Sequence, residues 1–431
     1  MSAVTEPYFK IDGLRRLNGV LRVNGAKNAA LPCLAASLLS DEPSRLRWVP
    51  DIEDVHRFLE ILSVLGVESE FEDNEVVVRP SGVCEGSPPD ALAAALRASF
   101  LVMGPLLVRT GMASCGTPGG DVIGARPLDV HLAGFRALGA EVESVGGRTI
   151  ARAPTGLRGA TFVLDYPSVL GTENLLLAAT LAKGRTRLVN AAMEPEIVCL
   201  ADALNQMGAR ISGAGDHTIT IDGVERLSGA DHELIPDRIE SGSLLIAAAA
   251  TRGQVCLQGV RPDHLEALLG KLGETGVEVR RAPAQLDIGV GANARLLATN
   301  LQSLPYPGFA TDLQAPMTAL LTQVEGTSVV HERVFENRMQ HLGELRKFGA
   351  NIIAGGAAPV VIGPTPLSGA VVRGTDIRAT AALIVAALAA EGESRIYGVN
   401  HLSRGYADLA GQLRGLGADI ELVGSADTLA N

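Results

Sequence analysis

Six segments of the chain are rich in alanine and leucine and are apolar almost all round. They are LPCLAASLL, ASFLVMGPLLV, ENLLLAATLAKG, GSLLIAAAATRG, APMTALLTQVEG and TAALIVAALAAEG. A helix without a polar face has to be surrounded by protein, so each segment predicts a buried helix. Because alanine side chains are small, several such helices can pack closely together.

A second series runs in phase with the first and combines an amphipathic helix, a glycine and an alternating strand. Its copies are ILSVLGVESE, FRALGAEVES, LNQMGARISG, GETGVEVR, LRKFGANIIA and LRGLGADIEL. Glycine is the residue best suited to the left-handed position that ends a helix. The alternation after each glycine is typical of a half-exposed strand. The glycines follow one another at intervals of 68 to 73 residues and are Gly66, Gly139, Gly208, Gly276, Gly349 and Gly417.

Together the two series predict six repeats of about 70 residues, each with one buried helix, one amphipathic helix and several strands. Buried helices would lie inside, and sheets with amphipathic helices outside. Six such units exceed what one core normally holds, so we expect two domains of three repeats with a midpoint near Pro236–Asp237. A cleft between two similar domains is a common place for a ligand.

Composition narrows the functional class. The 431 residues carry 37 Lys and Arg against 48 Asp and Glu, a net charge of −11. An acidic chain of this kind argues against binding to nucleic acid or to an anionic membrane. Hydrophobic residues make up 47% and charged residues 20%, which excludes a disordered chain. Small-molecule substrates remain the expected partners.

The cysteines and the N-terminus bear on location. No two of the five cysteines form a CxxC pair, so we expect a reduced compartment without a disulfide framework or a zinc site. The eight histidines are scattered, and neither a metal nor another cofactor is expected. MSAVTEPYFK lacks the features of a signal peptide, and no apolar stretch approaches the roughly 18–20 residues that span a bilayer. These observations predict a soluble, cytoplasmic protein. The cysteines are Cys33, Cys84, Cys115, Cys199 and Cys256.

Two glycine-containing segments carry candidate chemistry. In VNGAKNAALP, residues 23–32, Lys27 and Asn28 stand at the start of a buried helix, where the helix dipole favours an anion over a cation. A bound anionic ligand would resolve that conflict, and a solvated lysine is the alternative. In PGGDVIGARPLDVHL, residues 118–132, a flexible glycine pair carries Asp121, followed by Arg126. This segment resembles a mobile loop that places an acid and a guanidinium on a substrate, and a plain surface turn is the alternative.

A third group of polar residues falls at the junctions between loops and helices in the C-terminal repeats. Arg97, at the start of the second buried segment, belongs with this group because an arginine beside an apolar helix needs an anion or a cleft. Several cations at such positions in an acidic protein suggest a phosphorylated or carboxylated substrate. The residues are Asp312, Asn337, Arg338, Asp376, Arg378 and Arg404.

At these motifs the chain resembles a known family. NGAKNAALP, LRASFLVMGPLL, GARPLDVHL, NAAMEPEIV, PDRIESGS, YPGFATDLQA, FENRMQHLGEL, TDIRATAALIVA and HLSRGY match, in order, the enolpyruvyl transferases that act on UDP-N-acetylglucosamine. The resemblance implies an α/β fold, a two-domain inside-out α/β barrel of six βαβαββ-type repeats. Residues 27–236 would form one domain with the mobile loop 118–130, and residues 1–26 plus 237–431 the other. The active site would lie in the cleft between them.

The resemblance implies a reaction as well as a fold. The enolpyruvyl group of phosphoenolpyruvate would pass to the 3′-hydroxyl of UDP-N-acetylglucosamine with release of phosphate, the first committed step of peptidoglycan synthesis. Lys27, Arg126 and Arg404 would hold the phosphate and carboxylate of phosphoenolpyruvate. Asn28 and Asp312 would hold the sugar, with Asp312 as the candidate base for the hydroxyl.

Further site residues follow from the same resemblance. Asp376 and Arg378 would complete the phosphoenolpyruvate site near Arg338. The nucleotide site would be lined by Arg97, Arg126, Pro127, Leu128, Asp129, Val130, Ser168 and Val169. The loop SVLGT, residues 168–172, departs from the family pattern because Leu170 replaces a glycine, and Tyr166 stands where some relatives have a lysine that contacts the nucleotide.

The main departure is Asp121, which stands where the family usually has cysteine. The pKa of a free aspartic acid is about 3.9, so the pKa of Asp121 must rise by about 3 before the acid can donate a proton near neutral pH. Such a rise corresponds to a free-energy difference of about 4 kcal/mol between the two protonation states. Closure against the charge of phosphoenolpyruvate could supply that rise. Some relatives carry aspartate here and are active but insensitive to fosfomycin, which alkylates the cysteine. We therefore expect an active, fosfomycin-insensitive enzyme with Asp121 as its acid.

Three alternatives stay open at this point. The first is the synthase that makes 5-enolpyruvylshikimate 3-phosphate, although its PGSKS-like and NAGTA-like segments are absent from the sequence. The second is a related transferase acting on another nucleotide acceptor, which the altered loop at residues 168–172 would fit. The third is an inactive homologue that binds UDP-sugars. The presence of Lys27, Asp312, Asp376 and Arg404 disfavours this last alternative.

Overall fold

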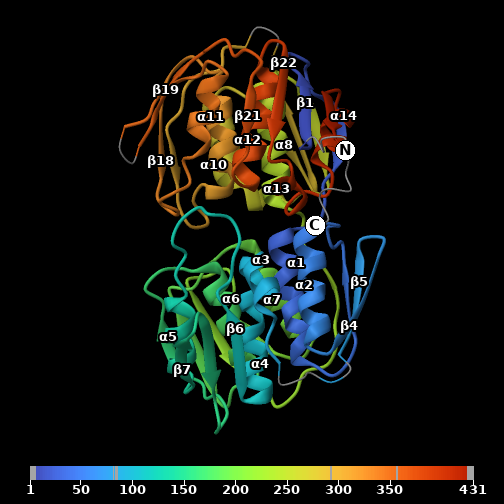
Figure 1. Ribbon diagram of the computed structural model, residues 1–431, viewed down its shortest axis with the longest axis vertical. Coiled ribbons are helices and arrows are strands. Elements are labelled where there is room, and N and C mark those ends of the chain that lie inside the picture. Colours follow the sequence, from blue (N-terminus) through green and yellow to red (C-terminus); the bar gives the residue numbers. More distant parts are fainter. Residues whose placement is uncertain (1–5, 81, 83–85, 292–293, 356–357, 425–431) are drawn as a thin grey trace, which may run out of the picture. The chain divides into compact units, whose positions relative to one another are not determined.

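The computed structural model describes residues 6–80, 82, 86–291, 294–355 and 358–424. The chain divides into two compact units, shown in Figure 1. Unit 1 comprises Met1–Asn24, Val122–Ala125 and Pro236–Asn431. Unit 2 comprises Gly25–Asp121 and Arg126–Ile235. No helix in the described part of the chain is both long and apolar enough to cross a bilayer.

The interior of unit 2 consists of helices formed by the first three alanine- and leucine-rich segments. They are α1 (Lys27–Ala36), the 3₁₀ helix η2 (Arg97–Val102) with α4 (Met103–Thr110), and α6 (Val169–Thr180). Helix α6 contacts each of the others, and it is buried without interruption from Gly171 to Thr180. Most of these residues are apolar, and the polar Thr172, Glu173 and Asn174 are buried with them, as expected of a helix surrounded by protein.

The interior of unit 1 has the same design. Helices α8 (Arg238–Ala250), α10 (Thr311–Leu321) and α12 (Ile377–Ala389) contact one another and lie side by side in Figure 1. All residues of α12 are buried. The prediction that all six segments form buried helices is therefore confirmed.

The second series is confirmed as well. Each outer helix ends just before its glycine, and the six glycines have φ between 84° and 101°, the left-handed region in which residues with a Cβ are strained. The outer helices are α2 (Glu53–Val64), α5 (Asp129–Ala137), α7 (Pro195–Gln206), α9 (Glu266–Glu274), α11 (His341–Lys347) and α14 (Leu409–Gly415). The strands after the glycines are β4 (Val67–Glu72), β7 (Glu141–Val145), β11 (Arg210–Ser212), β15 (Glu278–Ala282), β19 (Asn351–Ile353) and β23 (Asp419–Val423).

Three sheets belong to unit 2, with strand orders β13-β3-β5-β4, β6-β8-β7 and β11-β12-β10-β9. Strand β13 comes from the end of the unit and runs parallel to β3, pairing Asp231 with Arg45. The remaining strands are β3 (Ser44–Arg47), β5 (Glu75–Pro80), β6 (Met112–Gly116), β8 (Arg148–Arg152), β9 (Thr161–Val163), β10 (Arg185–Val189), β12 (Thr218–Asp222) and β13 (Asp231–Glu233).

Unit 1 also has three sheets, with orders β15-β16-β14-β2, β17-β18-β20-β19 and β21-β22-β1-β23. The first two strands of the chain complete two of them, since β1 lies between β22 and β23 and β2 pairs with β14. Residues before position 25 therefore fold with the C-terminal half. The strands are β1 (Tyr8–Asp12), β2 (Asn18–Arg22), β14 (Gln254–Gln258), β16 (Gln285–Gly289), β17 (Leu301–Ser303), β18 (Gly326–Glu332), β20 (Val360–Gly363), β21 (Val371–Arg373) and β22 (Glu393–Tyr397).

Candidate active site

In unit 1 the structure places Asp312 between two arginines. Asp312 lies in the first turn of α10, Arg338 lies just before α11, and Arg378 lies in the first turn of α12. Asp312 Oδ1 is 2.8 Å from an Arg338 guanidinium nitrogen, and its Oδ2 is 2.9 Å from an Arg378 guanidinium nitrogen. The three residues are far apart in sequence, and the packing of α10 against α12 helps to bring them together.

This cluster is electrostatically strong because it is mostly buried. Side-chain exposure is 24% for Asp312 but only 5% and 6% for Arg338 and Arg378. Burial raises the pKa of Asp312, but the two guanidiniums outweigh that effect and hold the pKa well below its usual range. The carboxylate therefore stays charged, and it accepts a proton readily only if the arginines are drawn toward another anion.

The two arginines are themselves positioned by neighbours. Arg338 also donates to Thr311 Oγ1 at 2.9 Å, whereas its buried Nε has no hydrogen-bond partner among the described residues. The Arg378 guanidinium lies 5.3 Å from the ring centroid of Tyr406, a cation–π contact. Tyr406 in turn shares a 2.8 Å hydrogen bond with Ser243. The motifs YPGFATDLQA, PDRIESGS and HLSRGY contain Thr311, Ser243 and Tyr406, but sequence reasoning assigned no role to any of the three.

Asp376 and Arg404 complete the predicted residues of unit 1. Asp376 is the N-cap of α12, where its Oδ1 accepts from the amides of Arg378 and Ala379 at 2.9 and 3.0 Å. This cap has a structural role that the sequence analysis did not assign to it. Arg404 is half-buried immediately after α13 (Asn400–Ser403).

In unit 2, Lys27 and Asn28 are the first two residues of α1. Lys27 is 8% exposed and forms a 2.5 Å ion pair with Asp54 in the first turn of α2, so the solvated alternative is wrong. Asn28 is half-buried. No side chain caps the start of α1. Asp54 is a further member of this group that sequence reasoning missed, because no motif linked it to Lys27.

The glycine-rich loop has a backbone that only glycine can supply. A Cβ added at Gly119 would lie 1.6 Å from the carbonyl oxygen of Ala94, and Gly120 has a φ of 99°. Asp121, the next residue, is half-buried. The plain surface turn considered as an alternative does not require such close packing against α3 (Asp90–Ala95).

The loop then continues into unit 1 and returns. Residues Val122–Ala125 are grouped with unit 1, where the Ala125 amide donates to Glu336 Oε1 at 2.7 Å. The Asn337 amide donates to the carbonyl oxygen of Ile123 at 3.1 Å. Asn337, which the sequence analysis grouped with the substrate-binding cations, therefore contacts the loop.

Two cations lie close together where the loop returns to unit 2. The Arg97 guanidinium donates to the carbonyl oxygen of Arg126. Burial, and secondarily the charge of Arg126, lower the pKa of Arg97 to about 10. Two arginines in one place are typical of a site for an anion.

The residues predicted to line the nucleotide site gather at the starts of α5 and α6. Pro127 and Leu128 lead into α5, which begins at Asp129, and Ser168 caps α6 by accepting from the Gly171 amide at 3.2 Å. A Cβ on Gly171 would meet Val130 at 2.7 Å, so α5 and α6 approach closely here. Val169 and Leu170 pack in part against the core, and Tyr166 is 43% exposed. The altered loop therefore keeps its helix cap.

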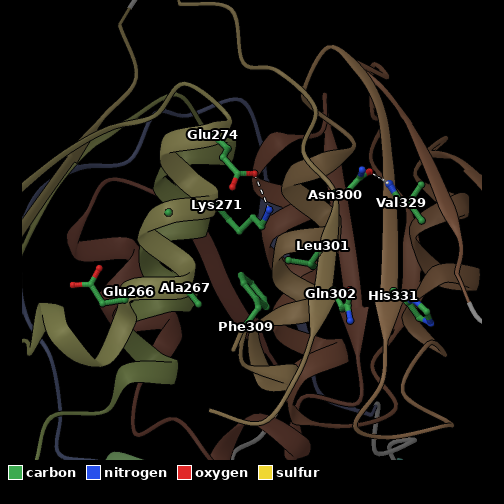
Figure 2. Close-up of a pocket in the computed structure, with 11 residues that line it drawn as sticks. Glu266, Ala267, Lys271, Glu274, Asn300, Leu301, Gln302, Phe309, Val329 and His331 are labelled. Atoms are coloured by element: carbon green, nitrogen blue, oxygen red, sulfur yellow. Dashed lines mark hydrogen bonds and ion pairs between the residues drawn. The ribbon is translucent and has the colours of Figure 1, made fainter. Parts of the chain in front are cut away.

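A separate cavity in unit 1, of about 690 Å³, contains none of the predicted site residues. Figure 2 shows Lys271 and Glu274 of α9 on one side and, on the other, Asn300 just before β17 together with Val329 and His331 of β18. Lys271 pairs with Glu274 at 2.7 Å, so the most prominent charges of this cavity satisfy each other. The cavity therefore adds nothing to the candidate site.

Comparisons with known proteins identify the family. The family model of EPSP synthase (3-phosphoshikimate 1-carboxyvinyltransferase) matches residues 11–413. UDP-N-acetylglucosamine 1-carboxyvinyltransferase 2 of Carboxydothermus hydrogenoformans is 49% identical, over 96% of this chain and 99% of the relative. The corresponding enzyme of Halothermothrix orenii is 48% identical, with the same coverage.

Solved structures agree on the fold. The enolpyruvyl transferase NikO from Streptomyces tendae has a TM-score of 0.87 and 25% identity, over 97% of this chain and 99% of that one. EPSP synthase from Acinetobacter baumannii has a TM-score of 0.74 at 18% identity, over 97% and 100% of the two chains, and shows the fold alone. The predicted fold and the resemblance are thereby confirmed, and the chain belongs to the enolpyruvyl transferase family.

Proposed function

We propose that the protein transfers the enolpyruvyl group of phosphoenolpyruvate to the 3′-hydroxyl of UDP-N-acetylglucosamine and releases phosphate. The observation that carries the proposal is identity of 48–49%, over 96% of the chain, to relatives named for this activity. The site supports it, because the residues that such chemistry needs are present in two groups, one in each unit. The reaction would commit its sugar to peptidoglycan synthesis.

The first chemical step is an addition. The sugar oxygen attacks C2 of phosphoenolpyruvate while a proton is added to C3, and a base takes the proton of the hydroxyl. Loss of a proton from C3 then restores the double bond as the bond from C2 to the phosphate oxygen breaks. One acid and one base, on different sides of the reacting carbon atoms, are sufficient for both steps.

Asp312 is the base in this proposal, and its arginines regulate its basicity. In the structure both guanidiniums stabilise the carboxylate, which makes it a weak base. An anionic substrate that attracts Arg378 or Arg338 would weaken those contacts and raise the pKa of Asp312. Substrate binding would thereby activate the base at the time when it is needed.

Asp121 is the acid in this proposal. It follows two glycines whose backbone is fixed by close contact with Ala94 and by a positive φ. Since a carboxylate is not alkylated as readily as a thiolate, the proposal includes insensitivity to fosfomycin. That insensitivity remains a prediction.

Cations hold the phosphoenolpyruvate. Lys27, Arg126 and Arg404 would bind its phosphate and carboxylate, with Arg378 and Asp376 beside them. Lys27 already pairs with Asp54, so an incoming phosphate would share the ammonium group with that carboxylate. Arg97 beside Arg126 would face the diphosphate of the nucleotide, which is the kind of group that two neighbouring guanidiniums bind.

One assay separates this proposal from its alternatives. Phosphate release is measured with phosphoenolpyruvate and either UDP-N-acetylglucosamine, shikimate 3-phosphate or other nucleotide sugars. We expect release with UDP-N-acetylglucosamine at a kcat/KM well above that for the other acceptors. A higher kcat/KM for another nucleotide sugar would contradict the assignment of the acceptor, and the unusual residues Leu170 and Tyr166 would then explain the altered preference. No phosphate release with any acceptor would indicate an inactive homologue.

The proposal also places the reaction in the cytoplasm. Both substrates are soluble anions, and the described part of the chain has no helix that could cross a membrane. Four cysteines in that part are free thiols, as expected in a reducing compartment. These observations support the location.

A further inference from the structure

Three metal-ligating side chains that are far apart in sequence come together in unit 2. Cys33 belongs to α1, Cys199 to α7 and His232 to β13. Their ligand atoms all lie within 4.8 Å of one another, and Cys199 Sγ is 3.3 Å from His232 Nε2. The sequence spacing predicted no zinc site, because it contains no CxxC pair. Packing of α7 against α1 and β13 creates a grouping that spacing cannot reveal.

The cluster is almost completely buried. Exposure is 3% for Cys33, 2% for Cys199 and 6% for His232. His232 Nδ1 is buried and has no hydrogen-bond partner among the described residues, while the opposite ring nitrogen is directed at Cys199. His232 Nε2 and the two sulfur atoms therefore lie close enough together for a single ion to bind all three.

The donor set and its spacing fit one class of ion. Two sulfur atoms and one imidazole nitrogen favour Zn²⁺, whereas Mg²⁺ and Ca²⁺ take oxygen ligands. Zinc–sulfur bonds of about 2.3 Å and zinc–nitrogen bonds of about 2.0–2.1 Å at a tetrahedral angle separate the two ligand atoms by about 3.5 Å. The observed 3.3 Å between Cys199 and His232 is close to that separation.

We propose that Cys33, Cys199 and His232 form a binding site for Zn²⁺, with a water molecule as the fourth ligand. None of the three belongs to the residues assigned to the transferase reaction. Their elements are nevertheless linked to it, since α1 begins with Lys27 and Asn28. A bound ion would join α1 to α7 and β13 and would hold the start of α1 in place.

The test is a metal titration of the full-length protein, reduced and freed of metal, with Cys84 replaced by serine throughout. Zn²⁺ is added in the presence of a chromophoric chelator, and Co²⁺ serves as a spectroscopic probe because thiolate ligation produces a charge-transfer absorption. We expect one equivalent of Zn²⁺ to bind, and thiolate absorption with Co²⁺. Cys33→Ser, Cys199→Ser and His232→Asn should each weaken binding by at least about ten-fold.

The chain offers matched controls. Cys115→Ser removes another fully buried thiol and Cys256→Ser a partly buried one, and both should leave Zn²⁺ binding unchanged. Circular dichroism and thermal unfolding report whether each variant has folded, independently of any enzymatic activity. Failure of the transferase assay would therefore leave this test intact.

Two results would overturn the proposal. The first is Zn²⁺ binding that is absent, or equally tight in Cys33→Ser and Cys199→Ser. The second comes from the protein in which Cys33, Cys199 and His232 are all intact, and it applies even if their variants misfold. Zn²⁺ should slow alkylation of Cys33 and Cys199, identified by mass spectrometry, but not that of Cys115 or Cys256, and equal alkylation with and without the ion would exclude the site.

Discussion

Asp121 and Asp312 are the two carboxylates to which we assign proton transfer, and their surroundings differ. Asp312 is held by two buried arginines, which stabilise its charged form. Asp121 is half-buried in a glycine-rich loop that packs against α3. The proposal gives these two carboxyl groups opposite roles, Asp312 as base and Asp121 as acid.

Replacement of Asp121 by asparagine should abolish most turnover. The amide is close in size but cannot donate a proton as a carboxylic acid does, so we expect kcat to fall by about 10²-fold or more with little change in KM for the nucleotide sugar. Phosphate release measures both constants. Val122→Ala, which alters a 75% exposed neighbour, is the matched control and should retain activity. A variant with asparagine that turns over at the original rate would refute the assignment.

Replacement of Asp121 by cysteine should create sensitivity to fosfomycin. The thiol can donate the proton and can also be alkylated by the epoxide, so the variant should be active and lose activity with time in the presence of the drug. Residual phosphate release and the mass of the loop peptide check both points. Time-dependent inactivation of the unmodified protein at residue 121 would be the opposite of this expectation.

Replacement of Asp312 by asparagine should cost both activity and stability. It leaves two buried guanidiniums without their carboxylate, so we expect the free energy of unfolding to fall by about 3 kcal/mol at neutral pH. Because folding lowers the pKa of Asp312, its contribution is complete above the unfolded value near 4 and declines as the pH falls below it. Denaturant unfolding from pH 7 downward measures the difference.

The control for this variant is Glu393→Gln, which removes a carboxylate from an exposed ion pair with Lys10. Exposed pairs contribute little, so its stability should be nearly unchanged at every pH. The free energies of unfolding of the Asp312 variant and the original protein should converge as the pH falls below about 4. The electrostatic explanation would be contradicted if their difference stayed constant or grew.

The sequence identified candidate site residues but not the side chains that contact them. The motifs pointed to Lys27 and Asp312, whose residue types and positions at helix starts are visible in the sequence. The carboxylate that binds Lys27 comes from Asp54 on another helix, and the cluster around Asp312 depends on helix packing. Contacts of this kind depend on tertiary structure, which local patterns do not encode.

The helices and strands were easier to predict from the sequence than the contacts between side chains. The buried and amphipathic helices follow from periodicity, and their ends follow from the glycines with positive φ. The order of strands within each sheet could not be derived from the pattern, because the alternation of polar and apolar residues in a strand does not indicate which strand pairs with it. The pairing of β1 with β22, for example, joins Tyr8 to Tyr397.

Asp376 has two roles, one in capping α12 and one proposed in binding the substrate, and two substitutions can distinguish them. As N-cap of α12 it accepts two backbone hydrogen bonds, and in the proposed function its charge also lies beside phosphoenolpyruvate. Asparagine caps helices about as well as aspartate, so Asp376→Asn should retain stability within about 0.5 kcal/mol and lose activity. Asp376→Ala should lose activity and about 1 kcal/mol of stability. Full activity of the asparagine variant would leave only the capping role.

At the scale of the whole molecule, the path of the chain matters most. Unit 2 is formed by residues 25–235, interrupted only by Val122–Ala125, which belong to unit 1. Unit 1 otherwise combines a short N-terminal segment with the C-terminal half of the sequence. Strand β1 is central in its sheet, with β22 on one side and β23 on the other, and it also contacts α12. The stability of unit 1 therefore depends on residues at the beginning of the chain.

Replacement of Ile11 by alanine should weaken unit 1 selectively. Ile11 is fully buried on β1, and removing its side chain leaves a cavity that costs about 2–5 kcal/mol. Hydrogen exchange should accelerate in α12, β22 and β23 but not in α1 or α6. Lys10→Ala, on the exposed side of the same strand, is the control and should change little. Equal loss of protection in both units would show that they unfold together.

The position of β1 and β2 also sets an order of events during synthesis. These strands leave the ribosome before the strands with which they pair, and β1 cannot gain its last neighbour until Asp419–Val423 has been made. Unit 2 can collapse in the meantime, because all of it has been translated once residue 235 is added. A nascent chain arrested before residue 419 would therefore carry a complete unit 2 and an incomplete sheet in unit 1, in which one edge of β1 is left unpaired and open to chaperones and to other strands.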